Sequence, residues 1–233
     1  EKPFSKGLFA SLAYTKSIAS NLHDGGGDQL SGVWQGTATI NGANTSPLSY
    51  ADYVVPDRIV GLISYRKEYF KYLGTTISMI YTGAVNGRFS YAYSGDFNRD
   101  GVSNNDLMYI PTAAQVQTML FSNTTVNGVT YNQQQQRDLF EAYVQQDKYL
   151  KAHRGQYAER NGGQIPWLSR FDVKFIQDLF LKTGKSRNTF QFTVDILNFA
   201  NLLNNKWGIN RTLNTSTPLV LANTMTPTTV PQF

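Results

Sequence analysis

The 233-residue chain contains no cysteine, which excludes disulfide bridges and metal sites built on thiolates. It is also poor in charge, because Asp, Glu, Lys and Arg make up only 16% of it, against about 25% in typical soluble domains. No apolar run reaches the length of about eighteen residues that a membrane-spanning helix needs. The sequence therefore predicts no transmembrane helix.

Signatures of catalysis and of nucleic-acid binding are also lacking. The formal net charge is +5, but the basic residues are scattered, so we expect no nucleic-acid partner. His23 and His153 are the two histidines and lie in different expected loops, and no serine stands in a G-x-S-x-G elbow. Some acidic residues lie on expected strand faces, and we interpret them as charges on a water-facing wall. We predict that the chain is not an enzyme.

What the sequence has is aromatic residues, 13% of the total, in segments that alternate with a period of two. The segment from Ile77 to Tyr93 is expected to be one uninterrupted strand, with one face apolar or aromatic and the other small and polar, and with Arg88 near its middle. The alternation returns from Trp167 to Lys182 and again from Phe190 to Ile196. Residues 7–20 and 58–70 are strand-like but alternate less cleanly. The pattern predicts an all-β protein.

The lengths of the connections decide between a soluble sandwich and a membrane barrel. Tight turns are expected at 71–74 and 183–188, whereas the connections at about 21–52, 96–166 and from 201 onward are long. Short periplasmic turns and long extracellular loops alternate in this way in outer-membrane barrels. We therefore predict an arc of a transmembrane antiparallel β-barrel, surrounded by lipid of the bacterial outer membrane.

The number of strands predicts that residues 1–233 form only part of a barrel. Five long strands can be counted, or six if the segment 217–233 contains another, and an open sheet edge is not tolerated in lipid. We expect a fragment of a larger chain. By parity, four charged residues are expected to face the lumen: Arg88, Arg170, Asp172 and Lys174.

The loop at 96–166 is expected to be partly helical. Apolar residues recur at roughly helical spacing, which predicts a helix at about 133–152 and a shorter one at 112–121.

The same loop begins with a calcium-loop spacing. The acid or amide residues at positions 1, 3 and 5 are followed by Gly101 at position 6, where the sharp turn requires a residue without Cβ. Position 12, which normally carries a bidentate acid, is Leu107. Hard oxygen ligands suit Ca²⁺, and the alternative is an Asx-turn loop that holds water. The candidate ligands of a structural Ca²⁺ are Asp96, Asn98, Asp100, the carbonyl of Val102, Asn104 and, one residue early, Asp106.

Three motifs give the chain a family resemblance. "GDFNRDGVSNNDLMYIP", "RNGGQIPW" leading into "RFDVKFIQDL", and "FTVDILNFANLLNNKWG" occur in this order. Together they resemble TonB-dependent outer-membrane receptors of Bacteroidetes, most closely the Oar-like group and then the SusC/RagA type, over roughly residues 75–210. The resemblance implies a 22-stranded barrel of which this is a late portion, with a plug and N-terminal domains that are absent here.

The resemblance also implies a function. Such receptors take up a large nutrient, and the TonB complex in the periplasm supplies energy through the missing N-terminal part. A second hypothesis is a structural barrel platform that binds a partner, such as a surface lipoprotein or a secretion machine. A third is a soluble, calcium-stabilised β-sandwich that binds glycan.

Overall fold

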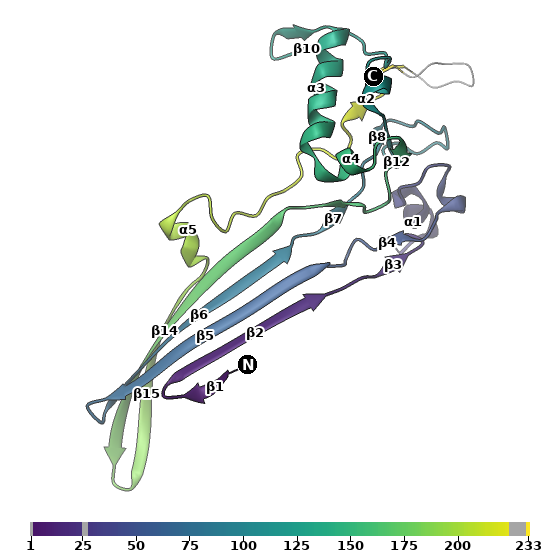
Figure 1. Ribbon diagram of the computed structural model, residues 1–233. Coiled ribbons are helices and arrows are strands. Elements are labelled where there is room, and N and C mark those ends of the chain that lie inside the picture. The colour runs from purple at the N-terminus through teal and green to yellow at the C-terminus, as the bar shows by residue number, and fades with distance from the viewer. Residues whose placement is uncertain (1, 25–27, 224–231) are drawn as a thin grey trace. The chain divides into compact units, whose positions relative to one another are not determined.

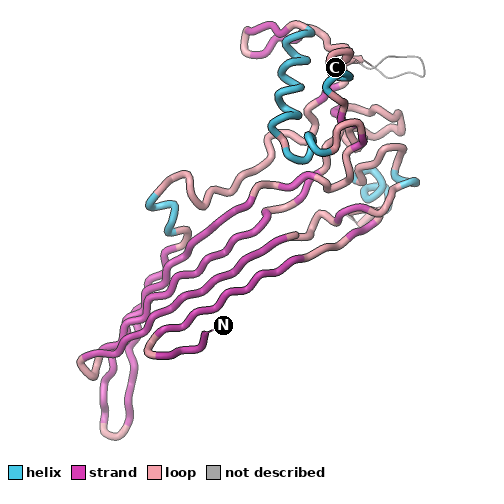
Figure 2. Tube along the Cα trace, in the orientation of Figure 1, coloured by secondary structure: helices cyan, strands magenta, loops and turns pink. Residues whose placement is uncertain are grey.

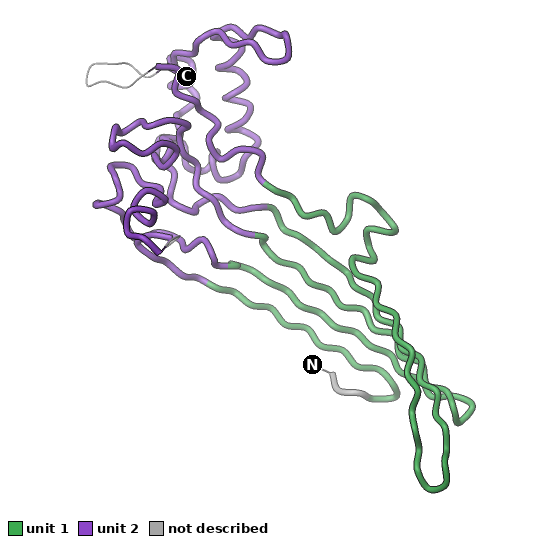
Figure 3. The backbone as a smooth tube through the Cα atoms, turned by 180° about the vertical axis from the view of Figure 1, so that it is seen from behind, with its two compact units in different colours: residues 1–17, 55–86, 166–212 green, residues 18–54, 87–165, 213–233 purple. Residues whose placement is uncertain are grey.

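The computed structural model describes residues 2–24, 28–223 and 232–233. The chain divides into two compact units, each assembled from three separate segments (Figure 3). The first unit comprises residues 1–17, 55–86 and 166–212, and the second comprises 18–54, 87–165 and 213–233. Each is described by itself below.

The first unit is a single antiparallel sheet of long strands (Figure 1). Its six strands, in spatial order, are β1 (Lys2–Ser5), β2 (Leu8–Lys16), β5 (Asp57–Tyr69), β6 (Leu73–Val85), β14 (Trp167–Thr183) and β15 (Ser186–Ile196). One short helix, α5 (Phe199–Leu203), follows β15. The predicted all-β class is confirmed, and the sixth strand is β1 rather than a part of 217–233.

Tight turns join neighbouring strands at one end of this sheet (Figure 2). Between β5 and β6 the turn occupies residues 70–72, one residue earlier than predicted, and Phe70 and Lys71 both have left-handed φ angles of 50° and 60°. Two residues with positive φ match the right-handed twist of the flanking strands. Residues 184–185 form the second predicted turn. The connections at 17–56 and 86–166 leave from the opposite end.

Strand pairing places the apolar positions of all five long strands on one face of the sheet. Leu8 pairs with Tyr65, Tyr65 with Ile77, and Phe175 with both Ile77 and Val194. Because side chains alternate between faces, this row fixes the parity of every other residue in the ladder. The large side chains exposed on this apolar face are Leu12, Tyr14, Ile63, Tyr65, Ile77, Met79, Trp167, Leu179, Leu181, Phe190, Phe192 and Val194.

The opposite, polar face contains a chain of hydrogen bonds and ion pairs across the strands. Arg66 contacts the buried carboxylate of Asp178 at 3.1 Å, and Gln191 donates to that carboxylate at 2.8 Å. Further along the face, Lys174 contacts Asp195 at 3.2 Å. Arg170, Asp172 and Lys174 lie on this face as their parity predicts. Arg66, Arg170 and Lys174 are thus each paired with an acidic side chain on this side of the sheet.

The prediction of one uninterrupted strand from Ile77 to Tyr93 is wrong. The strand begins earlier, at Leu73, and ends at Val85, because Gly87 adopts a φ of 137° that breaks the ladder. Arg88 is therefore not on the wall of the long sheet. It belongs to the short strand β7 (Arg88–Phe89) of the second unit, where it donates to the carbonyl of Asn161 at 3.0 Å.

The second unit contains short elements around an aromatic core. Its strands are β3 (Ser20–Asn21), β4 (Ser49–Tyr50), β7, β8 (Tyr93–Ser94), β9 (Tyr109–Ile110), β10 (Thr124–Val126), β11 (Val129–Tyr131), β12 (Gln156–Tyr157), β13 (Gly163–Gln164) and β16 (Leu219–Val220). Its helices are α1 (Leu30–Gly36), a 3₁₀ turn at Ala43–Thr45, α2 (Ala113–Val116), α3 (Gln133–Gln146) and α4 (Lys148–Ala152). The core residues are Tyr91, Tyr93, Met108, Ile110, Val116, Phe121, Phe140, Val144, Leu150, Ala158 and Leu219.

The two predicted helices are present in altered form. The helix predicted at 133–152 is divided at Asp147, whose side chain accepts the N–H of Leu150 at 2.8 Å and so begins α4. The helix predicted at 112–121 is limited to α2, which Thr112 caps. Of 217–233, the described part contributes β16, which pairs in parallel with β8, whereas 224–231 lie outside the described residues. Within the described ranges, no helix is both long and apolar enough to cross a membrane.

Candidate metal centre

The acidic loop that follows β8 is held closed by its own side chains. Asp96 accepts the N–H groups of Asp100 at 3.2 Å and Gly101 at 3.0 Å, and Asp100 accepts that of Val102 at 2.9 Å. Asn98 Oδ1 also accepts the N–H of Asp100, at 2.8 Å. Gly101 has a φ of 88°, which is the conformation that the calcium-loop spacing requires at this position.

Asp106 joins this loop from outside the 1-3-5 positions. Its Oδ2 accepts the N–H groups of Phe97 at 2.6 Å and Asn98 at 3.2 Å, so the carboxylate faces the start of the loop. Burial raises the pKa of Asp106, and the negative charges of Asp100 and Asp96 raise it further against the effect of those two bonds. An ionised carboxylate here is therefore costly unless a positive charge compensates it.

Asp106 and two residues joined to it through the backbone have buried polar atoms without partners in the described part of the chain. Asp106 is only 2% exposed, and its Oδ1 has no hydrogen-bond partner among the described residues. The side-chain amide of Asn105 and the hydroxyl of Thr39 are also buried, and neither has a hydrogen-bond partner within the ranges that the structure describes. The backbone of Thr39 pairs with both sides of Asp106, through bonds of 2.8 Å to Asn105 and 2.7 Å from Leu107. A bound cation would satisfy the oxygen atoms among these groups, whereas the amide N–H of Asn105 needs an acceptor such as a water molecule.

Of the six predicted ligands, four are connected to one another by hydrogen bonds, and the other two, Val102 and Asn104, have separate roles in the loop. Asp96, Asn98, Asp100 and Asp106 are connected through the bonds described above. Asn104 closes the loop instead, because its Oδ1 accepts the N–H of Gly95 at 3.1 Å. Val102 follows the turn, held through its N–H. No cluster of three His, Cys, Asp or Glu side chains already arranged around a metal position occurs in the described ranges.

Asn105 and Thr39 were not predicted as site residues. These two residues stand out only because they are buried away from water, where polar atoms are normally paired. Burial of a residue in a loop leaves no periodic pattern in the sequence, so it could not be predicted. Asn105 stands beside Asp106 within the motif, which was the one available indication.

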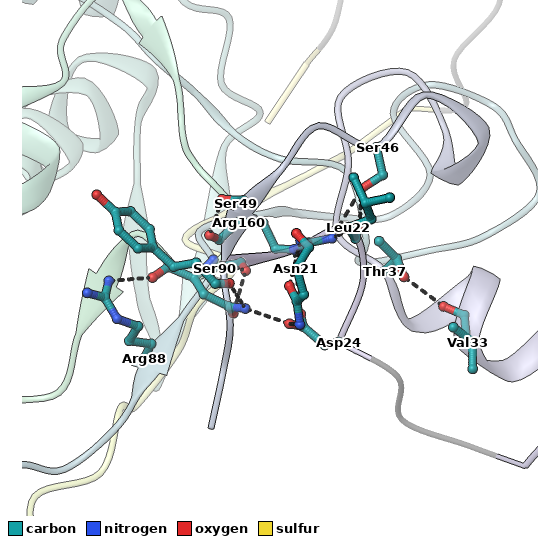
Figure 4. A network of polar contacts seen from close by, with 12 residues as sticks. Asn21, Leu22, Asp24, Val33, Thr37, Ser46, Ser49, Arg88, Ser90 and Arg160 are labelled. Carbon is teal, nitrogen blue, oxygen red and sulfur yellow. Dashed lines mark hydrogen bonds and ion pairs between the residues drawn. The ribbon is translucent and has the colours of Figure 1, made fainter. Parts of the chain in front are cut away.

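A second polar centre, around Arg160, joins the connection at 17–56 to the connection at 86–166 (Figure 4). The guanidinium is buried and donates to the backbone carbonyls of Asn21 and Leu22 and, at 3.1 Å, to the hydroxyl of Ser46. Asp24 lies 3.8 Å from its Nε. Burial lowers the pKa of Arg160, and the charge of Asp24 partly offsets this effect. Residues more than 130 positions apart in the chain are thereby fixed together.

Asn161 and the two glycines after it complete this centre. Asn161 donates from its side chain to Asp24 at 2.8 Å and to the carbonyl of Tyr50 at 2.9 Å. A Cβ on Gly162 would lie 2.3 Å from the hydroxyl of Tyr149, and one on Gly163 would lie 2.7 Å from the ring of Phe89. Each residue of the sequence R-N-G-G therefore has a role: the arginine is a buried cation, the asparagine a bridging amide, and the two glycines leave space for aromatic rings that approach the backbone closely.

Replacing Arg160 with methionine is expected to destabilise the second unit by about 3 kcal/mol. The methionine fills the space but leaves buried carbonyls without donors and Asp24 without its cation, each at a cost of about 1–3 kcal/mol. The measurement is the rate of limited proteolysis within residues 87–165. Lys148→Met, which removes an exposed cation, is the matched control and should leave this rate unchanged. Equal rates for the two variants would contradict the structural role of Arg160.

Comparisons of the chain with protein-family models, with curated proteins and with solved structures found no match.

Proposed function

We propose that this chain forms an arc of a transmembrane β-barrel in the bacterial outer membrane, as part of a TonB-dependent receptor that takes up a large nutrient. The observation that carries the proposal is the inverted polarity of the long sheet. Its polar face contains most of the buried side chains, among them Ser64, Thr76 and Asp178, whereas most of the large apolar side chains on the other face are exposed. Soluble proteins bury the apolar face of a sheet, and membrane barrels expose it to lipid.

The dimensions of the apolar face support a membrane location. From the row of Leu73 and Leu179 to that of Val85 and Trp167, the strands span twelve residues. This corresponds to about 40 Å along the strands, or about 30 Å across a bilayer at the usual strand tilt. Aromatic residues flank this band, with Tyr81 and Trp167 toward one end and Tyr69 at the other. Such aromatic girdles are typical of outer-membrane barrels.

The edges of the sheet support an arc rather than a complete structure. In the described residues, β1 and β15 are the two edges, and each has a neighbour on one side only. Open edges are not tolerated in lipid, so further strands must close the barrel. A glycan-binding sandwich would need a second large sheet to cover the apolar face. Every other sheet in the described part has two strands.

The long connections support a receptor role. Residues 18–54, 87–165 and 213–233 assemble into one unit with its own aromatic core, rather than remaining as separate loops. A folded unit of this kind is suited to bind a large substrate at the cell surface. A barrel platform that binds a surface lipoprotein is the second candidate, because the same unit provides a partner surface.

The acidic loop is proposed to bind a structural Ca²⁺. On binding, these side chains would turn from their backbone hydrogen bonds toward the ion, so that Asp96, Asp100 and Asp106 supply carboxylates and Asn98 an amide oxygen, all of them hard ligands. The buried, unpartnered Oδ1 of Asp106 supports a cation here over a loop closed by hydrogen bonds alone. The ion would compensate the ionised Asp106 and hold the start of the connection 86–166 to the segment around Thr39.

The experiment that separates the two candidate functions starts from a detergent-extracted outer-membrane fraction. The native polypeptide that contains these residues should be recovered there and be captured by the periplasmic domain of TonB. Recovery without capture would favour the platform. Recovery only from the aqueous fraction would contradict the membrane barrel itself.

A further inference from the structure

A pocket in the first unit lies where β15 separates from β14. Its volume is about 560 Å³, and its lining includes three aromatic and two basic side chains. The residues that matter for its chemistry are Trp167, Ser169, Phe171, Lys206, Trp207 and Arg211.

The pocket exists because the ladder between β14 and β15 begins at Val173, which pairs with Ile196. Beyond Ile196 the chain turns into α5, which packs against β14 (Figure 1). Asn198 holds this turn, since its N–H donates to Asp172 at 2.7 Å and its side chain donates to the carbonyl of Gly208 at 3.1 Å. The segment that carries Lys206 and Trp207 is therefore fixed beside the first residues of β14.

Trp167 is also held in place. Its indole N–H lies 3.1 Å from the hydroxyl of Ser169 and 3.3 Å from that of Tyr81. Gly83 provides the space, because a Cβ there would lie 2.7 Å from the Trp167 ring. Trp167 and Phe171 have the parity of the exposed apolar face, so the pocket adjoins that face directly. One side of the pocket is thus an extension of the surface proposed to contact lipid.

The other side of the pocket is cationic and lacks a counter-charge. Lys206 and Arg211 form no ion pair within the part of the chain that the structure describes, and no acidic side chain lines the pocket. This contrasts with the polar face of the same sheet, where Arg66 and Lys174 are both paired with acids. The pocket therefore combines an apolar wall with an uncompensated positive charge.

We propose that this pocket binds the phosphorylated headgroup of an outer-leaflet glycolipid. The acyl chains lie along Phe171 and the apolar face below it, the sugar packs against the rings of Trp167 and Trp207, and the phosphate contacts Lys206 and Arg211. Aromatic faces pack well on sugars at a membrane interface, and basic residues there attract anionic headgroups. The inference rests on the proposed membrane location and adds a specific lipid site to it.

The test uses the full-length chain in detergent micelles that contain lipid A with two phosphates, or the same lipid after removal of both. Native mass spectrometry measures the lipid retained. The phosphorylated form should be retained and the dephosphorylated form should be lost. Lys206→Gln with Arg211→Gln should reduce retention about 25-fold, because each cation near an anionic surface contributes about fivefold. Trp207→Ala provides a second variant that keeps both charges and should also reduce retention.

Lys182→Gln is the matched control, since Lys182 lies on β14 with the opposite parity. It should retain as much lipid as the unchanged chain. Equal retention of both lipid forms, competition by millimolar inorganic phosphate, or full retention by the double variant would each overturn the lipid site. Insertion of the same samples into vesicles is scored in parallel. If the double variant inserts normally but retains less lipid, the lipid site is supported independently of the barrel. If the unchanged chain fails to insert, the membrane barrel itself is contradicted.

Discussion

Met79→Arg is expected to destabilise the chain in lipid vesicles by about 2–4 kcal/mol, the largest effect of any single change on the apolar face. Met79 lies midway along β6 on the exposed apolar face. At the midpoint of a bilayer an arginine in contact with lipid costs about this much, and the cost falls toward the interfaces. The measurement is the free energy of unfolding of the full-length chain in vesicles, from urea titration.

Ile80→Arg is the matched control for this change. It introduces the same charge one residue along the same strand, on the polar face, where the backbone partner on β14 is Asp172. A cation beside this carboxylate should cost less than about 1 kcal/mol. If the two variants were equally destabilised, or if Ile80→Arg were the worse, the assignment of the apolar face to lipid would be contradicted.

Removing calcium is expected to expose the start of the connection 86–166 to proteolysis. A loop of this type in an extracellular protein binds Ca²⁺ with a dissociation constant of about 0.1–1 mM. At a hundredfold excess over that constant, the ion stabilises the folded state by about 2.7 kcal/mol. Protease resistance within residues 87–165 should therefore rise with Ca²⁺, fall with chelator and respond little to Mg²⁺, which requires a smaller and more rigid site.

Three variants separate calcium binding from the hydrogen bonds of the loop. Asp96→Asn with Asp100→Asn should abolish the response to Ca²⁺, whereas Asp28→Asn, an exposed acid outside the loop, should preserve it. Asp106→Asn should also abolish the response, and it should raise resistance in chelator, because it removes a buried charge that has no counter-ion. Identical resistance with and without chelator in the unchanged chain would exclude the site.

The long sheet was largely predictable because its residues obey a local rule. Trp167, Val173 and Phe175 share a parity that the register of β14 with β6 and β15 confirms. The end of β6 was missed because the alternation continues to Tyr93, while the backbone leaves the ladder at Gly87. Side-chain periodicity does not report where a strand loses its partner.

The second unit was less predictable because it depends on contacts between distant segments. The bonds from Arg160 to Asn21 and Leu22 join residues whose proximity has no local signature. The candidate metal loop was predictable from spacing through Asp96, Asn98 and Asp100, whereas the burial of Asp106 and Asn105 follows from backbone pairing with Thr39. Short-range motifs thus located the loop, and long-range packing determined which of its polar atoms lack partners.

The most direct test of the membrane assignment is a scan of single cysteines along β14 of the full-length chain in lipid vesicles. These residues contain no native cysteine, so each introduced thiol reports on its own position. A membrane barrel predicts that a water-soluble thiol reagent labels the accessible even positions Arg170, Lys174 and Ile176 and spares the odd ones at the centre of the band. Labelling of the odd positions at Val173 and Phe175 as fast as that of Lys174 would contradict it.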